Sequence, residues 1–358
     1  MFDQLVLPWL LLAFAAAGAA VWVAGIYLSN TTDVLASRFG LGQALGGLLL
    51  LAIVTNLPEL AITVSAALGN HLDLATGNIL GGIAMQTLVL VALDAFGLGR
   101  QDALTYRAAS LVLVLEGVLV VAVLAVAVLG SQLPTTAIMA RVPPAGLLIF
   151  GIWVVGLWLI GKAQKGLPWQ AQGTAPPGGQ PGKQGSAQQK QEAKAQQQHV
   201  STTRTVLVFL AAALVTLVAG VVLERSGDAI AGHLGMSGVL FGSTVLAAAT
   251  SLPELSTGLA SIKLGDYQLA VSDIFGGNAF LPVLFLLASV LSGQAVLPHA
   301  GKTDLYLTGL GMLLTCVYVY GLLFRPRRQL ARLGIDSLLV LVLYAVGVLG
   351  LLAISHQP

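Results

Sequence analysis

Two copies of one short motif contain the residues with the clearest potential for chemistry. The sequence reads TNLPE at 55–59 and TSLPE at 250–254, and each copy lies in the middle of a long apolar stretch. An unpaired carboxylate at the centre of a bilayer costs roughly 2.5–3.5 kcal/mol on membrane-insertion scales. Because no lysine or arginine lies at matching depth, we expect cations or protons to compensate the charges of Glu59 and Glu254.

The proline of each motif should expose backbone oxygens beside the glutamate. Pro58 and Pro253 have no N–H to donate to the carbonyl four residues earlier, so each helix should break at this point. The predicted ligands are oxygen atoms of Glu59, Glu254, Thr55, Asn56, Thr250 and Ser251, together with the backbone carbonyls of Val54 and Ala249. Hard cations such as Ca²⁺ and Na⁺ prefer such a ligand set. The structural alternative is a kinked helix whose glutamate bonds a neighbouring helix.

A second paired motif follows about one helix later in each half. It reads GNILGG at 77–82 and SDIFGG at 272–277. Glycines at these places favour close packing of backbones. Asn78 and Asp273 are candidate ligands, or alternatively supports for the broken helix backbone.

Both motifs belong to an internal repeat at an ungapped offset of 195 residues. The offset also pairs Asp33 with Asp228, Gly40 with Gly235, and Gly47 with Gly242. Since each half has an odd number of predicted spans, the two halves must cross the membrane in opposite directions. Inverted repeats are typical of secondary transporters, which bind substrate near the midplane where the repeats meet.

The composition and hydropathy place these motifs in a membrane protein. The chain has 358 residues, of which 56% are hydrophobic and only 9% charged, against about 25% charged in soluble domains. Apolar runs of spanning length fall at about 5–28, 41–68, 74–97, 107–129, 142–161, 205–223, 236–262, 267–292, 304–324 and 334–354. The predicted fold is therefore an all-α integral membrane protein of ten transmembrane helices, in two inverted five-helix repeats with broken helices at the ion site.

The polar segment between the halves divides the chain into its predicted parts. Residues 1–161 form the first repeat and 205–358 the second, while the glutamine-rich stretch 162–204 should be a disordered linker. With the N-terminus outside, fourteen lysines and arginines fall in inside loops and three, Arg141, Arg225 and Lys302, in outside loops. This bias predicts two outside termini and a cytoplasmic linker. We expect the membrane to be a bacterial inner (cell) membrane. His71, His233 and His299 then fall in outside loops without metal-ligand spacing, and we interpret them as surface residues.

The duplicated T-[SN]-L-P-E-L motif, followed by G/S-N/D-x-x-G-G, resembles the cation/calcium exchanger superfamily, which includes the sodium/calcium exchangers. The resemblance covers residues 33–90 and 228–285 and the ten-span plan. It implies alternating access, with Glu59 and Glu254 as the principal ligands of Ca²⁺ and of the exchanged ion. The neighbouring threonines and serine would supply further oxygens.

The chain departs from sodium/calcium exchangers at four places near the motifs. Those exchangers usually have serine at the places of Gly82 and Gly277, and an acid or amide at those of Gln86 and Leu281. Gln86 remains a candidate ligand, whereas Leu281 cannot coordinate a cation. The departures leave open whether Na⁺ or H⁺ is the coupling ion.

The function predicted from these features is exchange of Ca²⁺, or a related divalent cation, for Na⁺ or H⁺. A cation channel or passive pore is the alternative, and transport without a counter-ion gradient would favour it. We find no nucleophile–base pair or HExxH motif at membrane depth, and so expect neither enzymatic activity nor a cofactor. The expected partners are inorganic cations and the lipid bilayer, without nucleic acid. The deep Glu116 is either a proton carrier or a helix–helix hydrogen-bonding group.

Overall fold

The computed structural model describes residues 2, 5–38, 48–98, 102–136, 138–139, 141–168, 201–330 and 332–355. In this part of the chain, nine helices are long and apolar enough to cross a membrane. Most of the predicted linker, at 169–200, lies outside the described residues, so its disorder stays a prediction.

The described residues are almost entirely helical. The first half contains α1 (Leu7–Arg38), α2 (Leu48–Thr55), α3 (Leu57–Gly69), α4 (Leu72–Gly97), α5 (Leu104–Ala108), α6 (Leu111–Ser131) and α7 (Pro144–Lys165). The second half contains α9 (Thr202–Leu234), α10 (Gly238–Phe241), η3 (Gly242–Leu246), α11 (Ala247–Thr250), α12 (Leu252–Lys263), α13 (Tyr267–Phe280), η4 (Leu281–Val283), α14 (Leu284–Ser292), η5 (Leu297–His299), α15 (Lys302–Phe324) and α16 (Ile335–Ser355). A two-residue antiparallel ladder joins β1 (Gln329–Leu330) to β2 (Leu333–Gly334).

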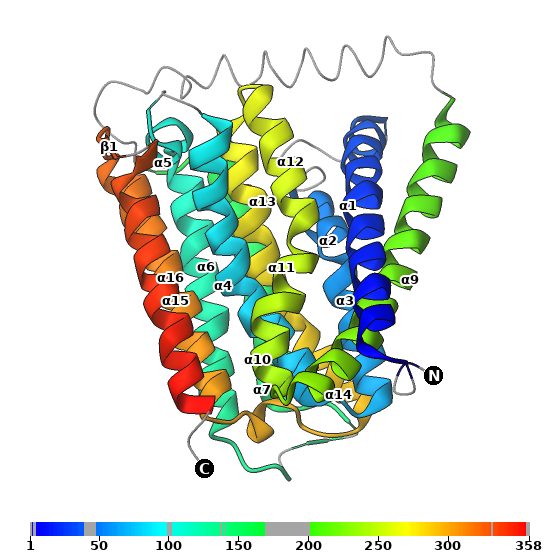
Figure 1. The fold of residues 1–358 in the computed structure, drawn as a ribbon. Coiled ribbons are helices and arrows are strands. Elements are labelled where there is room, and N and C mark those ends of the chain that lie inside the picture. The colour runs from blue at the N-terminus through cyan, green and yellow to red at the C-terminus, as the bar shows by residue number, and fades with distance from the viewer. Residues whose placement is uncertain are drawn as a thin grey trace.

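The helices form one bundle in which the long α1 and α9 pack along each other at one side (Figure 1). The beginning of α1 and the end of α16 lie at the same end of the bundle, while α9 begins at the opposite end. The motif helices α3, α4, α12 and α13 lie between this pair and the α15–α16 side, and are more buried than the outer helices. The repeat motifs are therefore enclosed by helices on both sides.

The nine candidate spans agree with nine of the ten predicted runs. The remaining run, 41–68, is described only from Leu48, as α2 and the short apolar helix α3. The tenth span stays a prediction for this reason.

Two helices continue well beyond their predicted runs: α1, expected to end near 28, continues to Arg38, and α9 continues beyond 223. The sequence placed the end of a span at residue 223, and so placed Arg225 and His233 in an outside loop, whereas α9 continues to Leu234. Hydropathy falls at Glu224, Arg225 and Asp228, but helical structure continues because these polar groups find partners across the bundle or in solvent.

The glycines of the second motif allow close helix packing, as expected. A Cβ atom at Gly77 would lie 2.7 Å from the backbone of Val239 in α10, and one at Gly81 would overlap the backbone of Ser243 in η3. α4 of the first repeat is thereby held directly against the segment that leads into the second TSLPE motif.

Candidate functional site

Both glutamates lie in the first turn of a helix that begins directly after a one-residue interruption. α2 ends at Thr55 and α3 begins at Leu57, with Asn56 between them at φ −87° and ψ 16°. Ser251 separates α11 from α12 at nearly the same dihedral angles, φ −80° and ψ 3°. The positive end of each helix dipole favours a carboxylate at this place.

The interruptions are bends rather than unwound stretches. The N–H of Leu60 donates to Asn56 O at 3.1 Å and that of Leu255 to Ser251 O at 3.2 Å, so helical bonding resumes at once. Val54 is buried and Ala249 only half-buried. Cation binding by their carbonyl oxygens stays a prediction.

Gln86 of α4 joins the two motifs. Its Nε2 donates to Asn56 Oδ1 at 3.0 Å and lies 3.3 Å from Glu254 Oε1 and 3.5 Å from Glu59 Oε1. All four side chains are fully buried. The structure therefore brings together, within one hydrogen-bonded group, two glutamates that are 195 residues apart in the sequence.

The hydroxyl groups of the motifs cross between the repeats. The carboxyl group of Glu59 lies beside the Thr250 hydroxyl, and that of Glu254 beside the Thr55 hydroxyl. Ser251 is also buried, but its Oγ donates to its own helix at Ala247 O. Each repeat thus places a threonine hydroxyl near the other repeat's carboxyl group, while Thr250 Oγ1 donates to Ala247 O in its own helix.

Asp273 lies at the edge of this group and connects three helices. Its Oδ1 lies 3.3 Å from Thr55 Oγ1, and its Oδ2 accepts a hydrogen bond of 2.6 Å from Thr257 Oγ1. These contacts join α13 to α2 and α12, which is a supporting role. Asn78, its repeat counterpart, is buried with both side-chain polar atoms unbonded, so it does not support the backbone through a hydrogen bond.

Several oxygen atoms of the group have no hydrogen-bond donor. They are Glu59 Oε2, Glu254 Oε2 and Gln86 Oε1. Within the described residues, no lysine, arginine or histidine forms a salt bridge with either glutamate. Buried acceptors without donors are costly, and a cation is the partner that would satisfy several of them together.

Two polar residues of this region were missed by sequence reasoning. Thr257 follows Glu254 by three residues and so shares its helix face, a spacing that could have indicated it. Asn278 donates to Ile83 O at 3.4 Å and to Thr87 Oγ1 at 3.1 Å. Asn278 and Ile83 occupy equivalent repeat positions, which could not be known to meet before the repeats were docked.

The glycine at 277 leaves room for the amide groups of the site. A Cβ atom at Gly277 would lie 2.6 Å from Asn56 Nδ2 and 3.2 Å from Gln86 Oε1. The Asn56 amide, with Gln86 Oε1 next to it, therefore occupies space that a serine at 277 would need. At the equivalent Gly82, a Cβ atom would make only an ordinary contact of 3.4 Å with Leu281 Cδ1.

Comparison with protein families identifies both halves of the chain. The sequence pattern of the family described as "Sodium/calcium exchanger protein" matches residues 9–161 and again 204–353. The two matches together cover most of the chain, and coincide with the two repeats. CaxA of Alkalimonas amylolytica, which is named as an antiporter, is 29% identical over 265 residues, or 73% of each chain.

Solved structures show the same fold at low sequence identity. The H⁺/Ca²⁺ exchanger CAX has a TM-score of 0.67 at 15% identity, with 96% of this chain and 82% of that chain covered. The sodium–calcium exchanger NCX_Mj has a TM-score of 0.59 at 15% identity, with 96% of this chain and 99% of that chain covered.

Proposed function

This chain belongs to the sodium/calcium exchanger protein family, and on that premise we propose that it exchanges Ca²⁺, or a related divalent cation, for Na⁺ or H⁺ by alternating access. Its apolar helices make it an integral membrane protein. The family consists of exchangers of inorganic cations, which supports cation antiport.

The observation that carries the proposal is the pair of buried glutamates with free Oε2 atoms. Glu59 and Glu254 come from different repeats, share the amide of Gln86, and have no basic partner among the described residues. One divalent cation or two monovalent cations would balance two carboxylates. The site therefore supports competition between one Ca²⁺ and two monovalent ions, which is what an exchanger requires.

Gln86 can interact with the site in both the cation-free and the cation-bound state of the proposed exchange. An amide group presents two donors on its nitrogen and an acceptor oxygen. The NH₂ group can hold the two carboxylates when no cation lies between them, and the unbonded Oε1 can turn toward a bound cation. Asn56, which accepts from Gln86, would follow this movement.

Binding of H⁺ as the counter-ion needs fewer side-chain oxygen ligands than binding of Na⁺. Leu281 and the glycines at 82 and 277 supply no side-chain oxygen, so the site is poor in ligands for several Na⁺ ions. A proton needs only a carboxylate. We therefore propose two-for-one exchange, and keep both H⁺ and Na⁺ as counter-ions to be compared.

The test is Ca²⁺ uptake into proteoliposomes under matched gradients. Outward gradients of Na⁺ and of H⁺ are imposed separately, with the membrane potential clamped. Uptake driven by one gradient and absent without it supports antiport and identifies the coupling ion. Uptake at the same rate without either gradient would show the alternative function, a channel or passive pore.

A further inference from the structure

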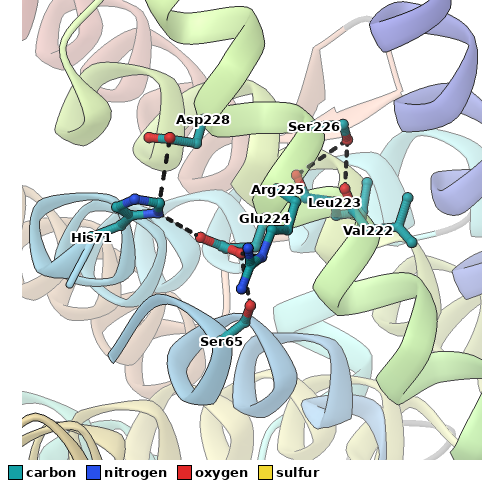
Figure 2. Close-up of polar contacts among 8 residues, drawn as sticks. All are labelled: Ser65, His71, Val222, Leu223, Glu224, Arg225, Ser226 and Asp228. Carbon is teal, nitrogen blue, oxygen red and sulfur yellow. Dashed lines mark hydrogen bonds and ion pairs between the residues drawn. The ribbon is translucent and has the colours of Figure 1, made fainter. Parts of the chain in front are cut away.

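A second polar cluster lies away from the ion site, where α3 ends and α4 begins (Figure 2). Ser65 Oγ donates to Glu224 Oε2 at 2.7 Å, and His71 Nδ1 lies 2.9 Å from Glu224 Oε1. Asp228 Oδ2 lies 3.8 Å from the same histidine nitrogen. We name the group of Ser65, His71, Glu224 and Asp228 the clasp, because it connects α9 to the end of α3.

The two central members of the clasp differ in exposure. The Glu224 side chain is 1% exposed, whereas that of His71 is 37% exposed. The carboxylate cannot leave its partners without being stranded in a buried place. The imidazole can still exchange a proton with water, so His71 is not the simple surface residue expected from the sequence.

The clasp acts on the helix that carries Glu59. Gly220, one turn before Glu224 in α9, packs against α3 so closely that a Cβ atom would lie 3.0 Å from Pro58 O and 2.7 Å from Ala61 Cβ. Thus α9 contacts both the start of α3, beside Glu59, and its end, through the clasp. Any separation of α3 from α9 beside Glu59 would therefore also have to break the contacts of the clasp.

Repeat symmetry shows that the clasp is an addition to one side of the bundle. Gly25, the counterpart of Gly220, packs on Pro253 in the same way, with a Cβ atom 2.8 Å from Pro253 Cβ. The counterparts of Glu224 and His71 are Ser29 and Asp266, which cannot form an acid–base pair. The helix contact is therefore duplicated in the two repeats, whereas the clasp is not.

The charged groups around His71 are mostly acidic. Glu224 and Asp228 face it from α9 and Asp73 from α4, while the basic Arg225 has its Nε 3.5 Å from Glu224 Oε2. α14, which also packs on α3, has no titratable side chain. A positive charge on the imidazole is therefore favoured.

We propose that the clasp is a proton-operated lock, in which protonated His71 holds α9 against α3 and restricts access to the ion site from that side. The proposal rests on the alternating-access function proposed above, with the α3–α4 turn on the outer side of the membrane. Histidine is the side chain suited to such a switch near neutral pH. A small movement of one packed helix is enough to open or close a path.

The direction of the switch follows from the surroundings of His71. The hydrogen bond to Glu224 raises the pKa of His71 above its usual value near 6.5, against the opposing effect of burial, and the charges of Asp228, Glu224 and Asp73 raise it further. The attraction is therefore fully present below about pH 6.5. It is lost as the pH rises through the raised pKa, so the lock opens on the alkaline side.

The test measures the lock directly, without depending on transport. Spin labels are attached through Leu68→Cys at the end of α3 and Leu234→Cys at the end of α9, both exposed positions, in a Cys316→Ser background. The distance between the labels is measured at pH 5.5 and pH 8.5. The parent protein should show a longer or broader distribution at pH 8.5.

Three variants decide the result. His71→Gln should give the open distribution at both pH values, and His71→Lys, which keeps its charge, should give the closed one at both. His299→Gln is the matched control, because that ring bonds its own backbone at Ala295 O, and it should keep the parent response. A parent distribution independent of pH, or a response that persists in His71→Gln, would overturn the lock.

Cation exchange rates of the same variants test whether the lock controls access to the ion site. At pH 6 on both sides of the membrane, His71→Gln should exchange cations several-fold faster than the parent protein and His299→Gln, and the three should converge at alkaline pH. Equal rates at pH 6 despite an altered label distance would overturn the role in access. If no variant transports, the antiport function fails, and the label distances still decide whether the lock exists.

Discussion

Replacing Glu254 by glutamine should weaken the stabilisation of the protein by Ca²⁺ without destabilising the cation-free protein. Glutamine has nearly the same shape and keeps an acceptor for Gln86 Nε2, which lies 3.3 Å from the glutamate. The change therefore removes one charge and little packing. A purely structural role and a cation-binding role then predict different results.

The expected loss of Ca²⁺ affinity follows from the removal of one of two buried charged ligands. Removing one partner of a buried charge pair costs about 2–5 kcal/mol, so the dissociation constant should rise by roughly 30-fold to several thousand-fold. At a Ca²⁺ concentration of about 100 times the wild-type constant, binding stabilises the native protein by ~2.7 kcal/mol. The same concentration should stabilise Glu254→Gln by ~0.9 kcal/mol or less.

The assay is thermal unfolding in detergent, with Ca²⁺ titrated into both proteins at pH 8. Without cation, the variant should be at least as stable as the wild type, because the glutamine replaces a buried acid whose Oε2 has no hydrogen-bond partner in the structure. Equal stabilisation of both proteins by Ca²⁺ would refute the ligand role. A cation-free variant destabilised by several kcal/mol would show that Glu254 is structural instead.

Three further predictions concern the surroundings of the site. Gly82→Ala should unfold at a temperature within a few degrees of that of the wild type. The repeat-equivalent Gly277→Ala should displace Asn56 Nδ2, and should clearly lower both the unfolding temperature and the exchange rate. Equal effects of the two substitutions would refute the steric explanation. Exchange should be near two-for-one and move little net charge, so a potential of 100 mV, worth about 2.3 kcal/mol per net charge, should hardly shift the reversal condition in vesicles. A clear three-for-one Na⁺ coupling would mean that backbone or water oxygens replace the missing ligands. Shortening 170–198 should leave the exchange rate unchanged in correctly inserted protein, since about a dozen flexible residues still cover tens of ångströms.

The sequence was sufficient for the features that depend on repetition and hydropathy. The 195-residue offset required Glu59 and Glu254 to be related by the repeat, and the structure joins them through one side chain. The sequence could not show that Gln86 is the side chain that joins the two glutamates, because this depends on how α4 lies between the two motif helices. Composition likewise could not show where α9 ends.

The clasp shows most clearly what hydropathy cannot detect. Glu224 reads as the polar end of a span, yet its side chain is buried, with hydrogen-bond partners in Ser65 of α3 and in His71 of the turn between α3 and α4. Such contacts join residues more than 150 positions apart. They arise from the docking of the two repeats, which no local pattern specifies.

The central claim is that Glu59 and Glu254 together bind the transported cations. The most direct measurement is Ca²⁺ uptake by proteoliposomes that contain equal amounts of folded wild type, Glu59→Gln or Glu254→Gln, under an opposing Na⁺ or H⁺ gradient. The account predicts gradient-dependent uptake by the wild type, and uptake at the level of protein-free liposomes by each variant. Wild-type uptake rates in either variant would contradict it.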